Sequence, residues 1–455
     1  MGHLATKDEI LKQLQKRLHK NPIGVPEHTS VYEILSILFS EKEAEVGSKF
    51  PVGAVTFEEL QNVIGMNREE LEEILEGMTK KGLVVTSKKD HKVRYLLSMA
   101  MGGFFEFTFM RTSDSLPMKR LAELMYTYSS LLNDPYIRWY ADYMGVGHGK
   151  NILGILMKND DIKGKPPTDL PQSRYFPGVG LVSIHTNFGK PEEDINFLFH
   201  SDPYGGVSHG HPDQNAFTIE AFGEALAITS GYYPWYGSDH HRNWQRQTKS
   251  SNSITIDGWK GQQGVAAAKG KVVIFENRDV YDYILGDATQ AYMGLLTRFH
   301  RHVIHIRPGV YVIYDDLEAP EPVTFEWWLH ALSEMSVNES GKSIIVSEGD
   351  SRLKVNFLQS GKLKFDQFSG FPDPPEYRGE GRSAYKDQWH VTVSTVLKST
   401  KAQFITVLVP FKKDNQRDIS FGHLVEDINK ISFELKIDGK KYYVSLLPEV
   451  SVKEL

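Results

Sequence analysis

A long series of strand-like segments, which starts at Gly178 and has no helices between its members, most limits the fold of this chain. The segments are rich in β-branched and aromatic residues and are bounded by turn-forming residues. Clear examples lie at residues 271–276, 303–314, 325–330, 354–358, 391–396 and 404–409. Successive strands without crossover helices pair antiparallel, so the sequence predicts large antiparallel sheets packed face to face.

A tight turn is predicted near the end of this series, at Asp438-Gly439. Apolar residues alternate with polar ones on both sides of the pair, at Ile431, Phe433, Leu435, Ile437, Tyr442, Val444 and Leu446. An Asp-Gly pair between two alternating runs is typical of a two-residue type I′ hairpin. The C-terminal strands should therefore pair through this turn.

The first part of the chain has helical patterns instead. Thr56 and Asn67 can each cap a helix, and the apolar spacing after Asn67 is helical until Gly82. Residues 83–86 and 93–97 then have the composition of a two-stranded hairpin. Helix, turn, helix and hairpin in this order indicate a winged helix. The expected fold class is therefore α+β, an α-rich winged-helix domain followed by a large antiparallel β-supersandwich.

A winged-helix domain often binds DNA by placing one helix in the major groove. Here the candidate helix carries five glutamates, which are Glu69, Glu70, Glu72, Glu73 and Glu76. With a formal net charge of -6 for the chain, this surface would repel phosphates. We therefore prefer a packing or protein-docking module. Nucleic acid is not an expected partner, and a winged-helix regulator is the weaker alternative.

The chain has no cysteine, which excludes disulfides, thiolate zinc sites and cysteine-ligated iron–sulfur clusters. Residues 20–125 nevertheless resemble the winged-helix head of some ferredoxin-type iron–sulfur proteins in the stretches NPIGVPEH, EEILEGMTKKGLV and MAMGGFFEFTF. No apolar run is long enough to span a bilayer, so no membrane partner is expected. The charged start of the chain lacks the apolar core of a signal peptide, so the chain as written would be cytoplasmic.

Residues 204–258 combine many titratable and aromatic side chains with closely spaced glycines. Glycines let the backbone turn sharply, so that polar side chains can meet in one pocket. The candidates are His209, His211, Asp213, Asn215, Tyr232, Tyr233, Tyr236, His240, His241 and Arg246. Because this density is unusual for a purely structural segment, we expect the active site here.

Residues 165–330 contain an ordered array of motifs, PPTDLPQSRYFPGVG, SHGHPDQNAF, GYYPWYGS, GDATQAY and TRFHRHVIHIRPGVYVIYDD. This array resembles the heparinase II/III-like polysaccharide lyases. The resemblance implies an N-terminal α/α toroid joined to a C-terminal antiparallel β-supersandwich. It also implies cleavage of uronic-acid polysaccharides, such as heparan sulfate or alginate, by β-elimination. Members of the family are often periplasmic.

The implied reaction explains the residue types in the candidate segment. A base removes the C5 proton of the uronate once its carboxylate is neutralised, and an acid protonates the departing O4. The resemblance assigns His209 as the catalytic histidine, and Tyr233, Tyr236 and Arg246 are further catalytic candidates. The candidates for substrate binding are Asn215, Gln262 and His241. Core packing of the tyrosines and an ordinary salt bridge of the arginine are the structural alternatives.

The resemblance also implies a metal ligand at His211, usually for zinc. The positions of the family's other ligands hold Thr229 and Ser251, which are poor zinc ligands. His240 or His241 could substitute, or His211 could be a hydrogen-bonding residue of the sandwich. We therefore expect little or no tightly bound zinc.

The expected domains are a winged-helix-like domain at residues 1–120, a helical toroid remnant with a linker at 121–168, and a β-sandwich domain at 169–455. Most of the family's catalytic toroid has no counterpart here. The leading hypothesis is therefore a lyase-related protein with impaired activity on acidic polysaccharides or oligosaccharides. The alternative is a non-catalytic carbohydrate-binding or scaffold protein. Whether the protein forms a homodimer stays open.

Overall fold

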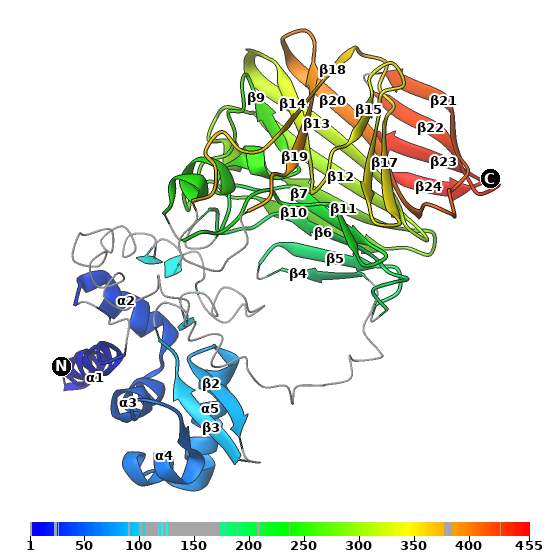
Figure 1. The fold of residues 1–455 in the computed structure, drawn as a ribbon. Coiled ribbons are helices and arrows are strands. Elements are labelled where there is room, and N and C mark those ends of the chain that lie inside the picture. Colours follow the sequence, from blue (N-terminus) through cyan, green and yellow to red (C-terminus); the bar gives the residue numbers. More distant parts are fainter. Residues whose placement is uncertain are drawn as a thin grey trace. The chain divides into compact units, whose positions relative to one another are not determined.

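The structure is a computed structural model that describes residues 2–21, 25, 27–89, 92–99, 103–104, 117, 120–121, 124–125, 173–177, 179–188, 190–206, 210–235, 237–376, 385–427 and 429–455. The described residues fall into two compact units. One is a small helical unit at the N-terminal end, and the other is a large unit of antiparallel sheets (Figure 1). The described chain is therefore mostly β.

The helical unit is built from short helices that begin at well-formed caps. Its helices are α1 (Gly2–Leu18), α2 (Thr29–Leu38), α3 (Glu41–Lys49), α4 (Phe57–Ile64) and α5 (Arg68–Lys80). Thr56 and Glu59 form a reciprocal capping box before α4, and the Asn67 side chain accepts a hydrogen bond from the Glu70 N–H before α5. Both predicted caps are confirmed.

Helix α5 buries one face and exposes the other. Its buried residues are Leu71, Ile74, Leu75 and Met78, as the helical spacing predicts. The glutamates at positions 69, 72, 73 and 76 are exposed. A three-stranded sheet in the order β1-β3-β2 follows in the same unit, from β1 (Val55–Thr56), β2 (Val84–Lys89) and β3 (Lys92–Leu97). The predicted hairpin is therefore present.

Four antiparallel sheets make up the large unit. The first, of five strands, has the order β4 (Ser173–Phe176), β5 (Leu181–His185), β6 (Ile195–His200), β7 (Ala216–Ala221) and β8 (Glu224–Ala227). The second, of four strands, has the order β18 (Leu363–Ser369), β19 (Trp389–Thr395), β14 (Phe325–Ala331) and β9 (Ile254–Ile256).

The other two sheets complete the layers. The largest sheet has eight strands in the order β10 (Lys271–Asn277), β11 (Tyr281–Asp287), β12 (Arg298–Ile306), β13 (Val310–Val323), β20 (Ser399–Lys412), β17 (Ser351–Phe357), β16 (Ser343–Glu348) and β15 (Ser336–Asn338). The last, of four strands, has the order β21 (Ile419–Asp427), β22 (Lys430–Ile437), β23 (Lys440–Leu447) and β24 (Ser451–Glu454), and it is drawn in red (Figure 1).

The eight-stranded sheet is buried on both faces. One face packs against the β4–β8 sheet and the sheet that contains β14, with Phe197, Trp327 and Ile313 in that core. The opposite face packs against the β21–β24 sheet, with Ile304 and Phe433 in the second core. Neighbouring residues of one strand point to opposite faces, so each central strand supplies both cores.

The predicted turn at the C-terminal end is confirmed. β22 pairs with β23 through Ile437 and Lys440, which flank the turn. Asp438 has a φ of 49° and Gly439 a φ of 88°, and type I′ turns require positive φ at both central residues. Among the helices that the structure describes, none has both the length and the apolar character to cross a membrane.

Candidate functional site

The candidate segment lies between β6 and the short helical turns that precede β9. His209 and Tyr236 fall outside the described residues, so their catalytic roles stay predictions. The other predicted site residues are described. They lie in the loop between β6 and β7, in the loop after β8, and in the turn η2 (His241–Gln245) with Arg246 directly after it, while Gln262 lies after β9.

Two hydrogen bonds connect the loop after β6 to the turn η2. The Nδ1–H of His211 donates to the Gln245 carbonyl over 2.9 Å. The guanidinium of Arg246 donates to the Gly206 carbonyl. The structure therefore brings Arg246 to the loop between β6 and β7. We call this segment the histidine loop, because it carries His209 and His211. With Nδ1 protonated, the Nε2 of His211 holds the free electron pair of the ring.

A charged pair stabilises the base of the same loop. His200, at the end of β6, has its Nδ1 3.0 Å from Oδ1 of Asp213, two residues after His211. Burial alone would lower the pKa of His200, but the Asp213 carboxylate outweighs it and raises that pKa to about 9. Although burial opposes it, the imidazolium keeps the pKa of Asp213 below its usual range. The loop is therefore anchored by an ion pair.

A second carboxylate lies beside this pair. Burial raises the pKa of Asp202 to about 6, although the charge on His200 acts in the opposite direction. Its Oδ1 accepts a hydrogen bond of 2.5 Å from the backbone N–H of Tyr204. The sequence analysis did not single out His200 or Asp202. His200 ends a strand of alternating burial, and that position was the available signal.

Both ring nitrogens of His240 form hydrogen bonds within the fold. Its Nδ1–H donates to the Asp373 carbonyl over 2.6 Å, and its Nε2 accepts from the N–H of Tyr232 over 3.1 Å. Burial lowers the pKa of His240, and Nε2 can accept this hydrogen bond only in the neutral ring. Both nitrogens are in use, so this histidine is not available to a metal.

His241 and Tyr233 form an aromatic contact. Nδ1 of His241 accepts a hydrogen bond of 3.0 Å from the N–H of Gly237. The rings of Tyr233 and His241 meet edge to face, with centroids 5.3 Å apart. The Tyr233 side chain is exposed while His241 is buried. Of these two, Tyr233 is the residue that a soluble ligand can reach.

Asn215 is part of the β framework. Its Nδ2 donates to the carbonyls of Gly286 and Phe299, and its Oδ1 accepts from the Ser201 hydroxyl. Its backbone has a φ of 60°, a conformation that asparagine tolerates better than most residues. The side chain is fully buried, so direct substrate contact would require these bonds to break.

The side chain of Gln262, like that of Asn215, forms hydrogen bonds to the backbone. Its side-chain amide accepts from the N–H of Gln214 over 2.7 Å and donates to the carbonyl of the same residue over 2.8 Å. It is also buried. Both polar atoms of the side chain support the loop backbone, and its predicted role in substrate binding stays a prediction.

The residues around His211 do not fit zinc. At the family's other ligand positions, Thr229 is exposed, and the Ser251 hydroxyl is buried without a hydrogen-bond partner. Both are neutral hydroxyls, which bring no charge to offset Zn²⁺. In the described part of the chain, no three histidine, aspartate or glutamate side chains gather into a metal-binding group.

Comparison with known proteins identifies relatives of the β unit. The family model described as "Heparinase II/III-like, C-terminal" matches residues 168–419, which is more than half of the chain. No curated protein matches the chain.

Solved structures of lyases share the fold. Heparan sulfate lyase HepC from Pedobacter heparinus is 15% identical with a TM-score of 0.53, over 97% of this chain and 62% of that chain. A structure of heparinase III is 14% identical with a TM-score of 0.52, over 96% of this chain and 62% of that chain. The chain therefore spans about three fifths of the length of these enzymes. At such identities the likeness shows the fold alone.

Proposed function

Because this chain belongs to the heparinase II/III-like family, we propose that it acts on uronic-acid-containing glycans by β-elimination. The similar structures are named as heparan sulfate lyase and heparinase III, so a glycosaminoglycan is the proposed substrate class. The single observation that carries the proposal is the connection of the histidine loop to Arg246 through Gly206 and Gln245. It puts a permanent cation beside the loop that holds the family's histidine.

Each site residue has a proposed role in this reaction. The guanidinium of Arg246 neutralises the uronate carboxylate, which acidifies the C5 proton. His209, with Tyr233 and Tyr236, supplies the base and the acid that the elimination needs. His241 orients Tyr233 through their ring contact. Asn215 and Gln262 act as positioning residues, because their bonds fix the backbone around the loop.

The domain organisation extends the proposal. We assign a winged-helix-like domain to residues 1–120, a helical remnant of the toroid with a linker to 121–168, and a heparinase II/III-like β-sandwich domain to 169–455. The exposed acidic face of α5 favours packing or protein docking over DNA binding for the first domain.

A non-catalytic glycan binder is the second candidate function. The observation that favours it is that the side chains of Asn215, Gln262 and His240 are all engaged in hydrogen bonds within the fold. A site whose polar groups are held in this way would retain binding and eliminate slowly or not at all.

Absorbance of the unsaturated uronate product separates the two functions. The protein is incubated with heparan sulfate, alginate, hyaluronan and pectin, and glycan binding is measured in parallel. A lyase gives rising absorbance with at least one glycan, and the rise is lost in Arg246→Met. Arg242→Met is the matched control, because Arg242 lies in the same turn and pairs with exposed Asp239. Binding without new absorbance supports the second function. The absence of both binding and new absorbance would overturn both functions.

A further inference from the structure

A hollow of about 410 Å³ lies on the sheet that contains β14, and no residue of the histidine loop lines it. The inward residues of this sheet, such as Trp327 and Val393, belong to the core, so the alternate residues form its outer face. The hollow is lined on that face by Trp259, Phe368, Glu326, Asp366, Thr392 and Ser394.

An unusual turn places Trp259 at the hollow. Three successive residues, Asp257, Gly258 and Trp259, have positive φ values of 43°, 79° and 74°. A bulky residue with positive φ is strained and needs support from its surroundings. The support comes from Glu326, whose carboxylate accepts hydrogen bonds of 2.9 Å from the N–H groups of both Gly258 and Trp259. The fold therefore holds the indole in place at some cost.

The Trp259 ring gives the hollow an apolar wall. It stacks on Phe368 with centroids 5.6 Å apart and an interplanar angle of 15°. It also meets the edge of buried Trp328 at 5.4 Å. Even so, Trp259 remains 36% exposed. A rigid, partly exposed aromatic surface is a good contact for the C–H face of a sugar ring.

The floor of the hollow supplies polar groups. Thr392 and Ser394 are 6% and 9% exposed. Among the described residues their hydroxyls have no hydrogen-bond partner, and neither hydroxyl is sealed from solvent. Asp366 adds a carboxylate that is 2.8 Å from the Lys364 ammonium. Unused hydroxyls beside a carboxylate match the ring hydroxyls of a sugar.

The charges of the lining indicate which sugar fits. Glu326 and Asp366 carry two negative charges and Lys364 carries one positive charge, while the Lys249 ammonium lies 5.5 Å from the centroid of the Trp259 ring. The charges around the hollow therefore balance, so it offers a uronate or a sulfated sugar no excess of positive charge, and a neutral ring fits it. We propose that this hollow is a second glycan-binding site that takes an uncharged hexopyranose or N-acetylhexosamine. None of its lining residues has a role in the proposed elimination.

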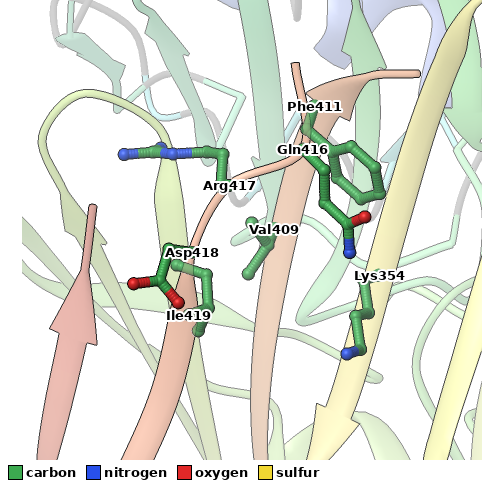
Figure 2. Close-up of a pocket in the computed structure, with 7 residues that line it drawn as sticks. All are labelled: Lys354, Val409, Phe411, Gln416, Arg417, Asp418 and Ile419. Atoms are coloured by element: carbon green, nitrogen blue, oxygen red, sulfur yellow. The ribbon is translucent and has the colours of Figure 1, made fainter. Parts of the chain in front are cut away.

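Another hollow, of about 170 Å³, is a weaker candidate (Figure 2). It is lined by residues of β17 and β20 and by those that lead into β21. Figure 2 shows Arg417 directed away from Lys354 and Gln416, and its guanidinium pairs with Asp438 at 2.8 Å. It is the smaller of the two and has no exposed aromatic wall, so it does not offer the same contact.

Saturation-transfer NMR with free N-acetylglucosamine, glucose and glucuronate tests the proposal on the full chain. We expect transfer to the two neutral sugars that depends on Trp259. Any transfer to glucuronate belongs to the proposed elimination site, so it should depend on Arg246 and not on Trp259. Trp259→Ala should weaken binding of the neutral sugars by about tenfold or more, because the stacking surface is lost. Phe421→Ala is the matched control, since Phe421 is 37% exposed but lies on the β21–β24 sheet.

A second variant guards against a damaged turn. Thr392→Val replaces a hydroxyl in the floor with a methyl group, which is a much smaller change than loss of the indole. This variant should also weaken binding of the neutral sugars. Arg246→Met should leave this binding unchanged, whatever the outcome of the absorbance assay. The proposal is overturned if the unaltered protein binds neither neutral sugar. It is also overturned if Trp259→Ala and Phe421→Ala bind the neutral sugars equally, or if Trp259→Ala weakens binding of glucuronate as much as binding of the neutral sugars.

Discussion

Arg301 of β12 and Asp315 of β13 form a fully buried ion pair, with Nε to Oδ1 at 2.6 Å and Nη2 to Oδ2 at 3.0 Å. The remaining nitrogen of the guanidinium, Nη1, donates to the carbonyls of Asn215 and Asn252. This one side chain therefore connects the central sheet to both ends of the segment that carries the candidate site.

Loss of Arg301 should destabilise the β unit strongly. Arg301→Met leaves the Asp315 charge buried without its partner, and breaking such a pair costs about 3–5 kcal/mol. Arg298→Met is the control on the same strand, because Arg298 is 43% exposed and its ion pairs are 3.4 Å long. That change should cost no more than about 1 kcal/mol. Urea unfolding followed by tryptophan fluorescence measures both, and equal midpoints for the two variants would contradict the prediction.

The His200–Asp213 pair should make stability depend on pH. The pKa of His200 is about 9 in the folded chain, against about 6.5 when unfolded, so the folded state binds more protons between these values. The pair therefore stabilises fully below about pH 6.5, and its contribution falls as the pH rises toward 9. Asp202, whose pKa is raised to about 6, titrates below this pH window and so does not contribute to the decline.

Unfolding free energies at about pH 6.5 and about pH 9.5 test this dependence. We expect His200→Gln to remove most of the decline. His300→Gln, at a histidine that is 37% exposed, should leave the decline in place. An unchanged decline in His200→Gln would show that other groups cause it.

Gly286 of β11 has to be a glycine for Asn215 to keep its position. A methyl group at Gly286 would overlap the Asn215 amide oxygen and the Phe199 ring. Gly286→Ala should therefore cost about 1–3 kcal/mol, as overpacking of a core does. Gly361→Ala is the control, since no atom lies within 4 Å of its added carbon. Thermal unfolding of the two variants should separate them clearly.

Zinc should be substoichiometric in the purified protein, and chelator should change its melting temperature little. The reason is the donor set, in which His211 is accompanied by the hydroxyls of Thr229 and Ser251. Elemental analysis and melting curves with and without chelator provide the measurement. One tightly held zinc per chain that is lost in His211→Ala would prove the local argument wrong.

Patterns that depend on near neighbours could be predicted from the sequence. The caps at Thr56 and Asn67, the buried face of α5 and the turn at Asp438 are all set within a few residues. The alternation of apolar residues also placed the example strands outside residues 303–314, because each sheet has faces that must be buried. The single strand predicted at 303–314 was wrong, because a turn between Ile306 and Val310 divides it into β12 and β13.

Contacts between distant residues could not be predicted in the same way. Asn215 binds carbonyls 71 and 84 positions away, and His240 binds the carbonyl of Asp373, 133 positions away. An asparagine or histidine in a framework has the same letter as one in a binding pocket. Trp259 was also missed, since a single tryptophan after Asp-Gly gives no sign that Glu326 holds its backbone in a strained form.

The central sheet, whose two faces are both covered, has a consequence for how the family can vary in length. In β13, Val312 supplies one core and Ile313 the other. An insertion or deletion of one residue inside the strand would exchange every following side chain between the two cores at once. Gains and losses of sequence among relatives should therefore collect in the connections between strands, while strands such as β12, β13 and β20 keep constant lengths.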